Sequence, residues 1–133
     1  MTNITTNSEA ATIALGKKYA VNLNPGDVLG LVGELGAGKT QFAKGLAKGL
    51  GIKDNITSPT FVLLKKYKNL VHIDCYRLSD PTELEELGFQ EFIDNGNIVV
   101  VEWADKIKSI MPSETKWVKF KVGSKENERV ITL

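Results

Sequence analysis

The segment Gly33-Glu34-Leu35-Gly36-Ala37-Gly38-Lys39-Thr40 is a complete G-x-x-x-x-G-K-[ST] phosphate-binding motif. Its glycines let successive backbone N–H groups turn toward a phosphate, and a helix N-terminus adds partial positive charge. We expect Lys39 to reach the outer phosphates and the Thr40 hydroxyl to complete the shell of a magnesium ion. A glycine-rich turn without a ligand is the alternative. The apolar run 28–32 before the motif and the helical pattern from Lys39 to Leu50 after it favour a nucleoside triphosphate site.

The rest of the chain alternates between helical and strand patterns. An amphipathic helix is expected to end near Ala20, with Thr6 or Ser8 as its N-cap. Asp80 and Pro81 have the chemistry of a helix start, Leu84 and Leu87 are expected to face inward, and Gly88 ends that helix. Short helices are also expected at 89–93 and 104–110. Strands are expected at 28–32, 61–67, 70–77, 98–102, 118–122 and 130–133.

The connections between these strands indicate the fold class. Only Lys68 and Asn69 separate 61–67 from 70–77, which permits an antiparallel hairpin and excludes a helical crossover. The run 98–102 is apolar without alternation, as in a strand covered on both faces. The predicted class is α/β, a three-layer P-loop NTPase-like fold of one domain over 1–133. Its mixed sheet has a parallel core and antiparallel hairpins, and ligands are expected at the carboxyl ends of the parallel strands.

Charge and cysteine content exclude several function classes. The net charge is +1, from 17 basic and 16 acidic residues, so strong independent binding to nucleic acid is not expected. The single cysteine, Cys75, cannot form an internal disulfide. Its odd spacing from His72, the single histidine, turns the two side chains to opposite faces of an extended segment, which argues against a Cys–His nucleophile. No stretch approaches the ~20 apolar residues of a membrane span, so we expect a cytoplasmic protein without membrane contact.

Two acidic residues end apolar strands and are candidates for the magnesium site. Asp74 follows the run 70–73, and Glu102 follows the run 98–101. A phosphate-binding loop needs such a carboxylate to organise the metal and the attacking water. A solvated acid at a strand end is the alternative for either residue, but two such acids in a phosphate-loop protein favour a shared site. Spacing does not assign the metal and water roles between them. Thr60 lies in a loop where nucleotide switches occur, although an ST-turn beside Pro59 is the plainer interpretation.

The motifs together resemble the bacterial TsaE (YjeE) family over essentially the whole chain. The matching segments are Gly33 to Thr40, Ser58-Pro59-Thr60-Phe61, His72-Ile73-Asp74-Cys75-Tyr76-Arg77-Leu78 and Glu102-Trp103. The resemblance implies a small ATPase that is needed for N6-threonylcarbamoyladenosine on tRNA. It would act on a complex containing TsaD and TsaB, bind ATP and Mg²⁺, and meet tRNA only through that complex.

The resemblance also implies roles for individual residues. Thr40 and Glu102 would serve the metal, and Asp74 would be the catalytic carboxylate, with Lys39 and Thr60 also in the catalytic set. Trp103 would lie near the nucleotide, while Glu9 and Ser124 would border the adenine. The phosphates would be held by Gly33, Leu35, Gly36, Ala37, Gly38, Lys39 and Thr40. His72 is interpreted as a structural hydrogen-bonding group rather than a metal ligand.

Other classes of phosphate-loop protein remain alternatives. A small-molecule kinase also combines this motif with a strand-end carboxylate, but it usually has an arginine-bearing lid, which this chain does not show. A GTPase is expected to carry an Asn-Lys-x-Asp segment, and a pure binding module would not hydrolyse its nucleotide. Only Arg77 and Arg129 are arginines, and Arg77 is the one near the predicted active edge. We therefore expect slow intrinsic ATP hydrolysis that a partner accelerates.

Overall fold

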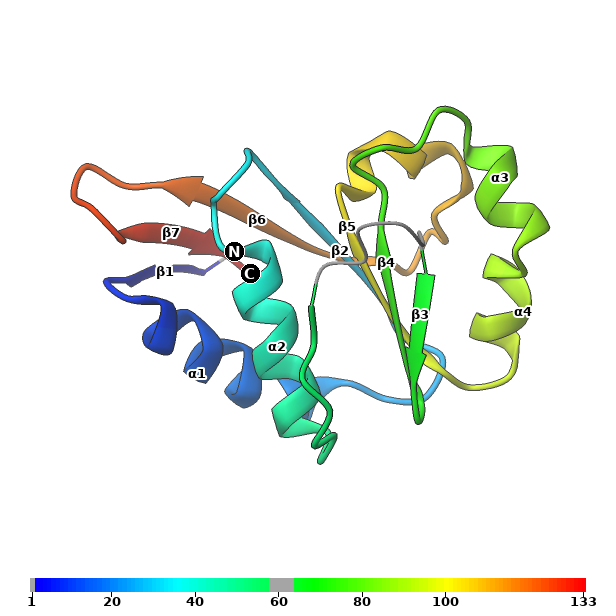
Figure 1. The fold of residues 1–133 in the computed structure, drawn as a ribbon, viewed down its shortest axis with the longest axis horizontal. Coiled ribbons are helices and arrows are strands. Elements are labelled where there is room, and N and C mark those ends of the chain that lie inside the picture. Colours follow the sequence, from blue (N-terminus) through cyan, green and yellow to red (C-terminus); the bar gives the residue numbers. More distant parts are fainter. Residues whose placement is uncertain (1, 58–63) are drawn as a thin grey trace.

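The described part of the chain, residues 2–57 and 64–133 of a computed structural model, forms one mixed sheet (Figure 1). Seven strands of this part lie in the order β1-β7-β6-β2-β5-β4-β3. Their bounds are β1 Asn3–Thr6, β2 Val28–Gly33, β3 Leu64–Tyr67, β4 Leu70–Asp74, β5 Ile98–Glu102, β6 Lys116–Val122 and β7 Arg129–Thr132.

The sheet has a parallel centre with an antiparallel pair at each end. Strand β2 is parallel to both β5 and β6, and β4 is parallel to β5. The pairs β3–β4 and β6–β7 are antiparallel hairpins, and β1 adds to β7 at the edge. Because β4, β5 and β2 are parallel, their carboxyl ends lie at the same end of the sheet, beside the start of the helix that follows β2. The predicted fold class is confirmed in this respect.

Helices cover both faces of the sheet (Figure 1). They are α1 Glu9–Tyr19, η1 Ala20–Asn22, α2 Lys39–Gly49, α3 Pro81–Glu86, α4 Phe89–Asp94 and η2 Ala104–Ile110. Packed against α2, the side chains of Leu29, Leu31 and Val100 belong to one apolar cluster. Val71, Val99 and Val101 belong to a second cluster on the opposite face, with residues of α3, α4 and η2. This three-layer packing explains why β5 is buried along its whole length.

The two long helices pack closely because glycines line their contact. A Cβ added to Gly45 of α2 would lie 2.0 Å from the backbone oxygen of Ile13, and one added to Gly16 of α1 would lie 2.3 Å from that of Phe42. Neither backbone oxygen can move without disturbing its helix. The intrinsic cost of glycine in α2 is therefore offset by this close approach of α1.

Several local predictions are confirmed and others are wrong. Ser8, not Thr6, caps α1 by accepting a hydrogen bond from the Ala11 amide, and Asp80 caps α3. Leu84 is buried, but Leu87 is 51% exposed, because α3 has already ended at Glu86. The helix expected at 104–110 has 3₁₀ rather than α geometry, with a non-helical residue at Ile107.

The predicted strand bounds also differ from the structure. The strand expected at 70–77 ends at Asp74, since the chain turns there and the Leu78 amide donates to the Cys75 oxygen. Of the strand predicted at 61–67, residues 61–63 lie outside the described residues, and 64–67 form β3. No helix among the described residues combines the length and apolar character needed to cross a bilayer.

Candidate functional site

The phosphate-binding motif connects the end of β2 with the start of α2. Gly36 and Gly38 have φ angles of 77° and 104°, which L side chains rarely adopt. Gly33 is needed for space, because a Cβ there would lie 2.6 Å from the Phe120 backbone oxygen on β6. Gly38 is the N-cap of α2 and provides no side-chain cap for its first amides. The loop therefore has the glycine geometry and the uncapped helix start of an anion cradle.

Lys39 is folded back onto the loop that precedes it. Its Nζ atom donates to the backbone oxygens of Gly33 at 2.6 Å and Glu34 at 2.8 Å. The same atom lies 4.1 Å from the centre of the Trp103 ring. Burial lowers the pKa of this ammonium, and the negative charges of Glu102 and Asp74 oppose that shift. The Lys39 ammonium therefore contacts both the loop backbone and Trp103, within the electrostatic influence of Glu102 and Asp74.

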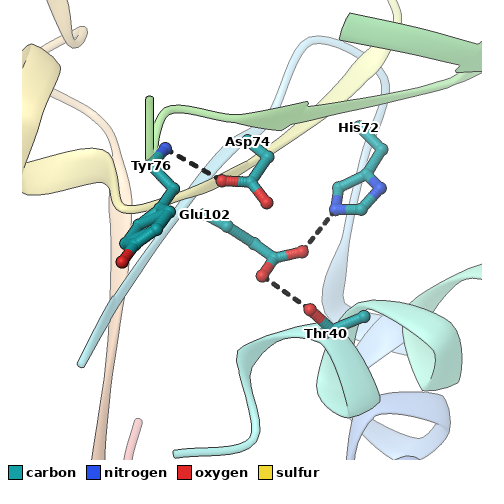
Figure 2. Close-up of polar contacts among 5 residues, drawn as sticks. All are labelled: Thr40, His72, Asp74, Tyr76 and Glu102. Carbon is teal, nitrogen blue, oxygen red and sulfur yellow. Dashed lines mark hydrogen bonds and ion pairs between the residues drawn. The ribbon is translucent and has the colours of Figure 1, made fainter. Parts of the chain in front are cut away.

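Glu102 connects the phosphate-binding loop to the sheet (Figure 2). Thr40 Oγ1 donates to Glu102 Oε1 at 2.8 Å, across 62 positions of the chain. The other carboxylate oxygen, Oε2, lies 2.6 Å from His72 Nε2 on β4. Glu102 is 2% exposed and His72 is fully buried. The hydroxyl expected at a metal and one of the two predicted acids are therefore in direct contact.

Asp74 lies beside Glu102, as the paired strand ends predicted. The two residues are partners in the parallel pairing of β4 with β5. Asp74 Oδ1 accepts the Tyr76 amide at 2.9 Å (Figure 2). Burial raises the pKa of the Asp74 carboxyl, the Tyr76 amide opposes that shift, and the negative Glu102 adds to it. The two carboxylates share one site at the carboxyl edge of the sheet.

Trp103 occupies the residue directly after Glu102 in a left-handed backbone conformation, with φ of 59°. Such a conformation is costly for a bulky residue, by about 1–3 kcal/mol, and often marks a functional site. The ring is 5.0 Å from that of Tyr76 and also packs against the cluster formed by η2 and the sheet. Trp103 therefore faces Lys39 while it also belongs partly to the core.

The oxygen donors at this site suit magnesium. The ion prefers hydroxyl, carboxylate and phosphate oxygens, and it commonly uses only one or two protein carboxylates. Thr40 and Glu102 already touch, with Asp74 on the neighbouring strand. Among the described residues there is no cluster of three or more His, Cys, Asp or Glu side chains that would form a metal cage without nucleotide. The donor set fits a metal that is bound together with phosphates.

The remaining predicted site residues take no part in the contacts above or lie outside the described residues. Thr60 lies outside the described residues. Glu9 is the first residue of α1 and is exposed. Ser124 lies in the turn between β6 and β7, where its amide and hydroxyl both donate to Glu128 Oε1. Leu35, at the tip of the phosphate-binding loop, is 71% exposed.

Sequence reasoning missed one residue that contacts the phosphate-binding loop. Arg129, the first residue of β7, donates from Nε to the Gly36 oxygen at 3.0 Å, whereas Arg77, the arginine expected near the active edge, is exposed. The sequence indicates that His72 is a structural hydrogen-bonding residue, and its partner in the structure is Glu102. The even spacing of His72 and Asp74 signals a shared face, but nothing local to Arg129 indicates its position.

Cys75 lies on the opposite face of the sheet from His72 and Glu102. It is buried in the cluster with Val71 and Ile73, on the face opposite His72. Burial raises the pKa of its thiol to about 12. A thiol with such a pKa is protonated at neutral pH, so Cys75 is not a nucleophile.

Comparison with known proteins settles the family. A family model described as "Threonylcarbamoyl adenosine biosynthesis protein TsaE" matches residues 6–131. The chain belongs to the TsaE family. A TsaE relative from Bacillus subtilis (strain 168), named as a tRNA threonylcarbamoyladenosine biosynthesis protein, is 43% identical over 125 residues, covering 91% of this chain and 77% of the relative. A relative of the same name from Rickettsia typhi is 46% identical over 112 residues, covering 80% and 77%.

A solved structure supports the TsaE-type fold. The crystal structure of Bacillus subtilis YdiB superposes with a TM-score of 0.79 at 36% sequence identity. The match covers 98% of this chain and 82% of that one. The predicted three-layer, P-loop NTPase-like class is therefore confirmed for this TsaE-family chain.

Proposed function

We propose that this TsaE-family chain is a magnesium-dependent ATPase of tRNA threonylcarbamoyladenosine biosynthesis. The single observation that carries the ATPase proposal is the contact between Thr40 and Glu102, with Asp74 paired beside them. A phosphate-binding loop without such acids would bind phosphate only. With them, it has the groups that position a metal and a water for hydrolysis. The role in tRNA modification is supported by the names of the relatives.

The loop and the two acids take separate roles in this proposal. Backbone amides of the phosphate-binding loop hold the phosphates, and Lys39 leaves its carbonyl partners to bind them. Thr40 and Glu102 hold the metal, which when bound neutralises charge on the phosphate oxygens. Leu35, Gly36, Ala37 and Gly38 contribute the loop, while nucleotide contacts by Glu9, Trp103 and Ser124 and a switch role for Thr60 stay predictions from the family resemblance.

Asp74 is the proposed group that orients the attacking water. Its Oδ1 is held by the Tyr76 amide, which fixes the carboxylate at the end of β4. The raised pKa of Asp74 makes it a stronger proton acceptor than an ordinary exposed aspartate. Glu102, by contrast, is already engaged through both oxygens. This difference supports the assignment of water to Asp74 and of metal to Glu102.

The protein partner in this proposal is a complex of TsaD and TsaB. We infer slow hydrolysis by the chain alone and faster hydrolysis in that cytoplasmic complex, with tRNA contacted only through it. The sequence holds two arginines, of which Arg129 already contacts the Gly36 carbonyl and Arg77 is exposed. A group supplied by a partner can raise such rates by roughly 10³–10⁵-fold. The single sheet supports residues 1–133 acting as one ATPase domain.

The test uses ATP labelled in its terminal phosphate, with and without purified TsaD–TsaB. Free phosphate released only when Mg²⁺ is present, and faster with the partners, is the expected result. Transfer of the label to a small molecule would indicate a kinase instead. Absence of hydrolysis under both conditions would refute the ATPase proposal, and equal rates would refute partner stimulation.

Two carboxylate variants test the division of roles. Asp74→Asn is expected to lower turnover by about 10²–10⁴-fold while ATP binding persists. Glu102→Gln is expected to weaken binding of the nucleotide in Mg²⁺ more than in EDTA. Asp54→Asn, which changes an exposed carboxylate on the loop after α2, is the matched control. The roles would be reversed if Asp74→Asn lost the magnesium dependence and Glu102→Gln retained it.

A further inference from the structure

His72 is a fully buried polar residue in the middle of a parallel strand. Its partners in the sheet are Val100 on β5 and Lys65 on β3. Val100 precedes Glu102 by two positions, so it lies on the same face of β5 as Glu102. His72 and Asp74 likewise share a face of β4. The register therefore places the imidazole next to the Glu102 carboxylate, on the face of the sheet that packs against α2.

The contact between His72 and Glu102 is short and directional. Nε2 lies 2.6 Å from Oε2, and both side chains are shielded from water (Figure 2). A carboxylate can only accept, so the imidazole donates from Nε2. Thr40 donates to the opposite oxygen, Oε1. Glu102 is therefore held between two donors, one on the sheet and one at the start of α2.

The second imidazole nitrogen, Nδ1, indicates that packing alone does not require a histidine at position 72. His72 Nδ1 is buried and has no hydrogen-bond partner among the described residues. A buried polar atom without a partner costs about 1–3 kcal/mol, and an apolar residue of similar size would avoid that cost in a buried strand. What histidine provides here, and an apolar residue does not, is the donor at Nε2.

We propose that His72 is a positioning residue that fixes the Glu102 carboxylate for magnesium binding. By holding Oε2, it directs Oε1 toward the Thr40 hydroxyl and prevents the carboxylate from rotating into the sheet. The inference rests on the proposed function, because it takes Glu102 and Thr40 as the magnesium-binding pair. His72 itself contacts neither the metal nor the nucleotide. It sets the affinity for the metal through Glu102.

Three substitutions separate the hydrogen bond from simple packing. His72→Gln places an amide nitrogen near the position of Nε2 and keeps the donor. His72→Asn reaches only as far as Nδ1, and His72→Leu removes the donor while filling the space. Val71→Ala is the control, because Val71 is the neighbouring buried residue on β4 but packs in the cluster on the opposite face. Truncating the Val71 side chain is expected to destabilise the same strand without removing a contact of Glu102.

The first readout is the Mg²⁺ concentration that half-saturates ADP binding, measured by titration, with ADP affinity in EDTA as the reference. Loss of a residue that orients a metal ligand typically weakens metal affinity about 10- to 100-fold. That weakening of Mg²⁺ affinity is expected for His72→Leu and His72→Asn, with ADP affinity in EDTA unchanged. His72→Gln is expected to keep most of the wild-type Mg²⁺ affinity. Should His72→Leu not fold, the His72→Asn and His72→Gln pair gives the same comparison.

The second readout does not depend on the nucleotide. Because the chain contains a single histidine, a ¹⁵N-labelled sample gives one set of imidazole signals. A proton on Nε2 that exchanges slowly with water is expected in the wild type and is expected to exchange faster in Glu102→Gln. A proton on Nδ1 alone in the wild type would overturn the proposal.

The outcomes distinguish this inference from the proposed function. If the wild type binds ADP with no dependence on Mg²⁺, the proposed function fails. If Glu102→Gln raises the half-saturating Mg²⁺ concentration but folded His72→Leu and His72→Asn do not, the positioning role fails and the proposed function stands. A shift of equal size in Val71→Ala would also overturn the positioning role, because strand damage alone would then explain it.

Discussion

The Nε atom of Arg129 donates to the backbone oxygen of Gly36 at 3.0 Å, which joins the first residue of β7 to the phosphate-binding loop. A second donor of the same guanidinium, Nη1, binds the Glu128 oxygen at 2.9 Å. The aliphatic part of the side chain lies close to Gly38. Arg129 therefore supports the loop from outside, in the part of the loop where two glycines adopt positive φ angles.

Removing this support is expected to weaken nucleotide binding. In Arg129→Met the Gly36 carbonyl loses its donor, and the loss of one such hydrogen bond is worth about 1 kcal/mol, or roughly a fivefold rise in the Kd for ATP. Hydrogen exchange of the amides at 34–38 without nucleotide is expected to quicken as well. Arg77→Met, which changes the other arginine of the chain, is the control. A larger effect of Arg77→Met would show that the loop does not depend on Arg129.

Trp103 is expected to report the movement of Lys39. Nucleotide phosphates compete for the Lys39 ammonium, which now lies over the Trp103 ring. In a Trp117→Phe background Trp103 is the only tryptophan. Its emission is expected to change in a saturable way on addition of MgATP. Lys39→Ala in the same background is expected to abolish the change, and an unaltered emission at ATP concentrations where calorimetry shows binding would contradict the prediction.

Replacing Gly45 by alanine is expected to destabilise the protein. In an ordinary helix interior this change stabilises by up to about 1 kcal/mol. Here the added methyl group would meet the Ile13 backbone oxygen, and such overpacking typically costs about 1–3 kcal/mol. Urea denaturation gives the free energy of unfolding. Lys48→Ala, at an exposed position of the same helix, is expected to leave it nearly unchanged. A more stable Gly45→Ala variant would show that α1 is free to move away.

Cys75 is expected to make stability fall in alkaline solution. In the unfolded chain its thiol loses a proton near the ordinary pKa of about 8.5, but in the folded protein only near a pKa of about 12. The unfolded state therefore binds fewer protons between these values, and the free energy of unfolding decreases as pH rises. Between about pH 7.5 and pH 9.5 the wild type is expected to lose about 1 kcal/mol more than Cys75→Ala. Equal losses in urea denaturation would contradict the raised pKa.

The sequence predicted those parts of the site that depend on short segments or on the rules of parallel sheets. Gly33 to Thr40 is one continuous motif, and Asp74 and Glu102 meet because the ends of neighbouring parallel strands meet. Arg129 was not predictable in this way. Its position follows from the pairing of β7 with β6 and of β6 with β2, which no local pattern specifies.

The local errors have physical causes as well. Helical spacing predicts that Leu87 faces the core, but α3 ends at Glu86. Helical spacing therefore does not apply to Leu87, and a bound that is wrong by one residue is enough to misplace its side chain. The predicted strand 70–77 is too long, because the chain leaves the sheet after Asp74 in a turn that closes at Leu78. In both places a local turn, closed by hydrogen bonds between residues three apart, sets the bound.

The order in which the chain is made bears on the central position of β2. Both neighbours of β2 in the sheet, β5 and β6, follow α2, β3 and β4 in the chain, and Arg129 follows both of them. During synthesis from the N-terminus, the phosphate-binding loop therefore emerges long before the strands that flank it and the arginine that supports it. A nascent chain therefore lacks Glu102, the proposed metal ligand, until β5 has been made, and it lacks the support of Arg129 until β7 has been made. MgATP is then expected to stabilise the folded domain more than shorter nascent chains.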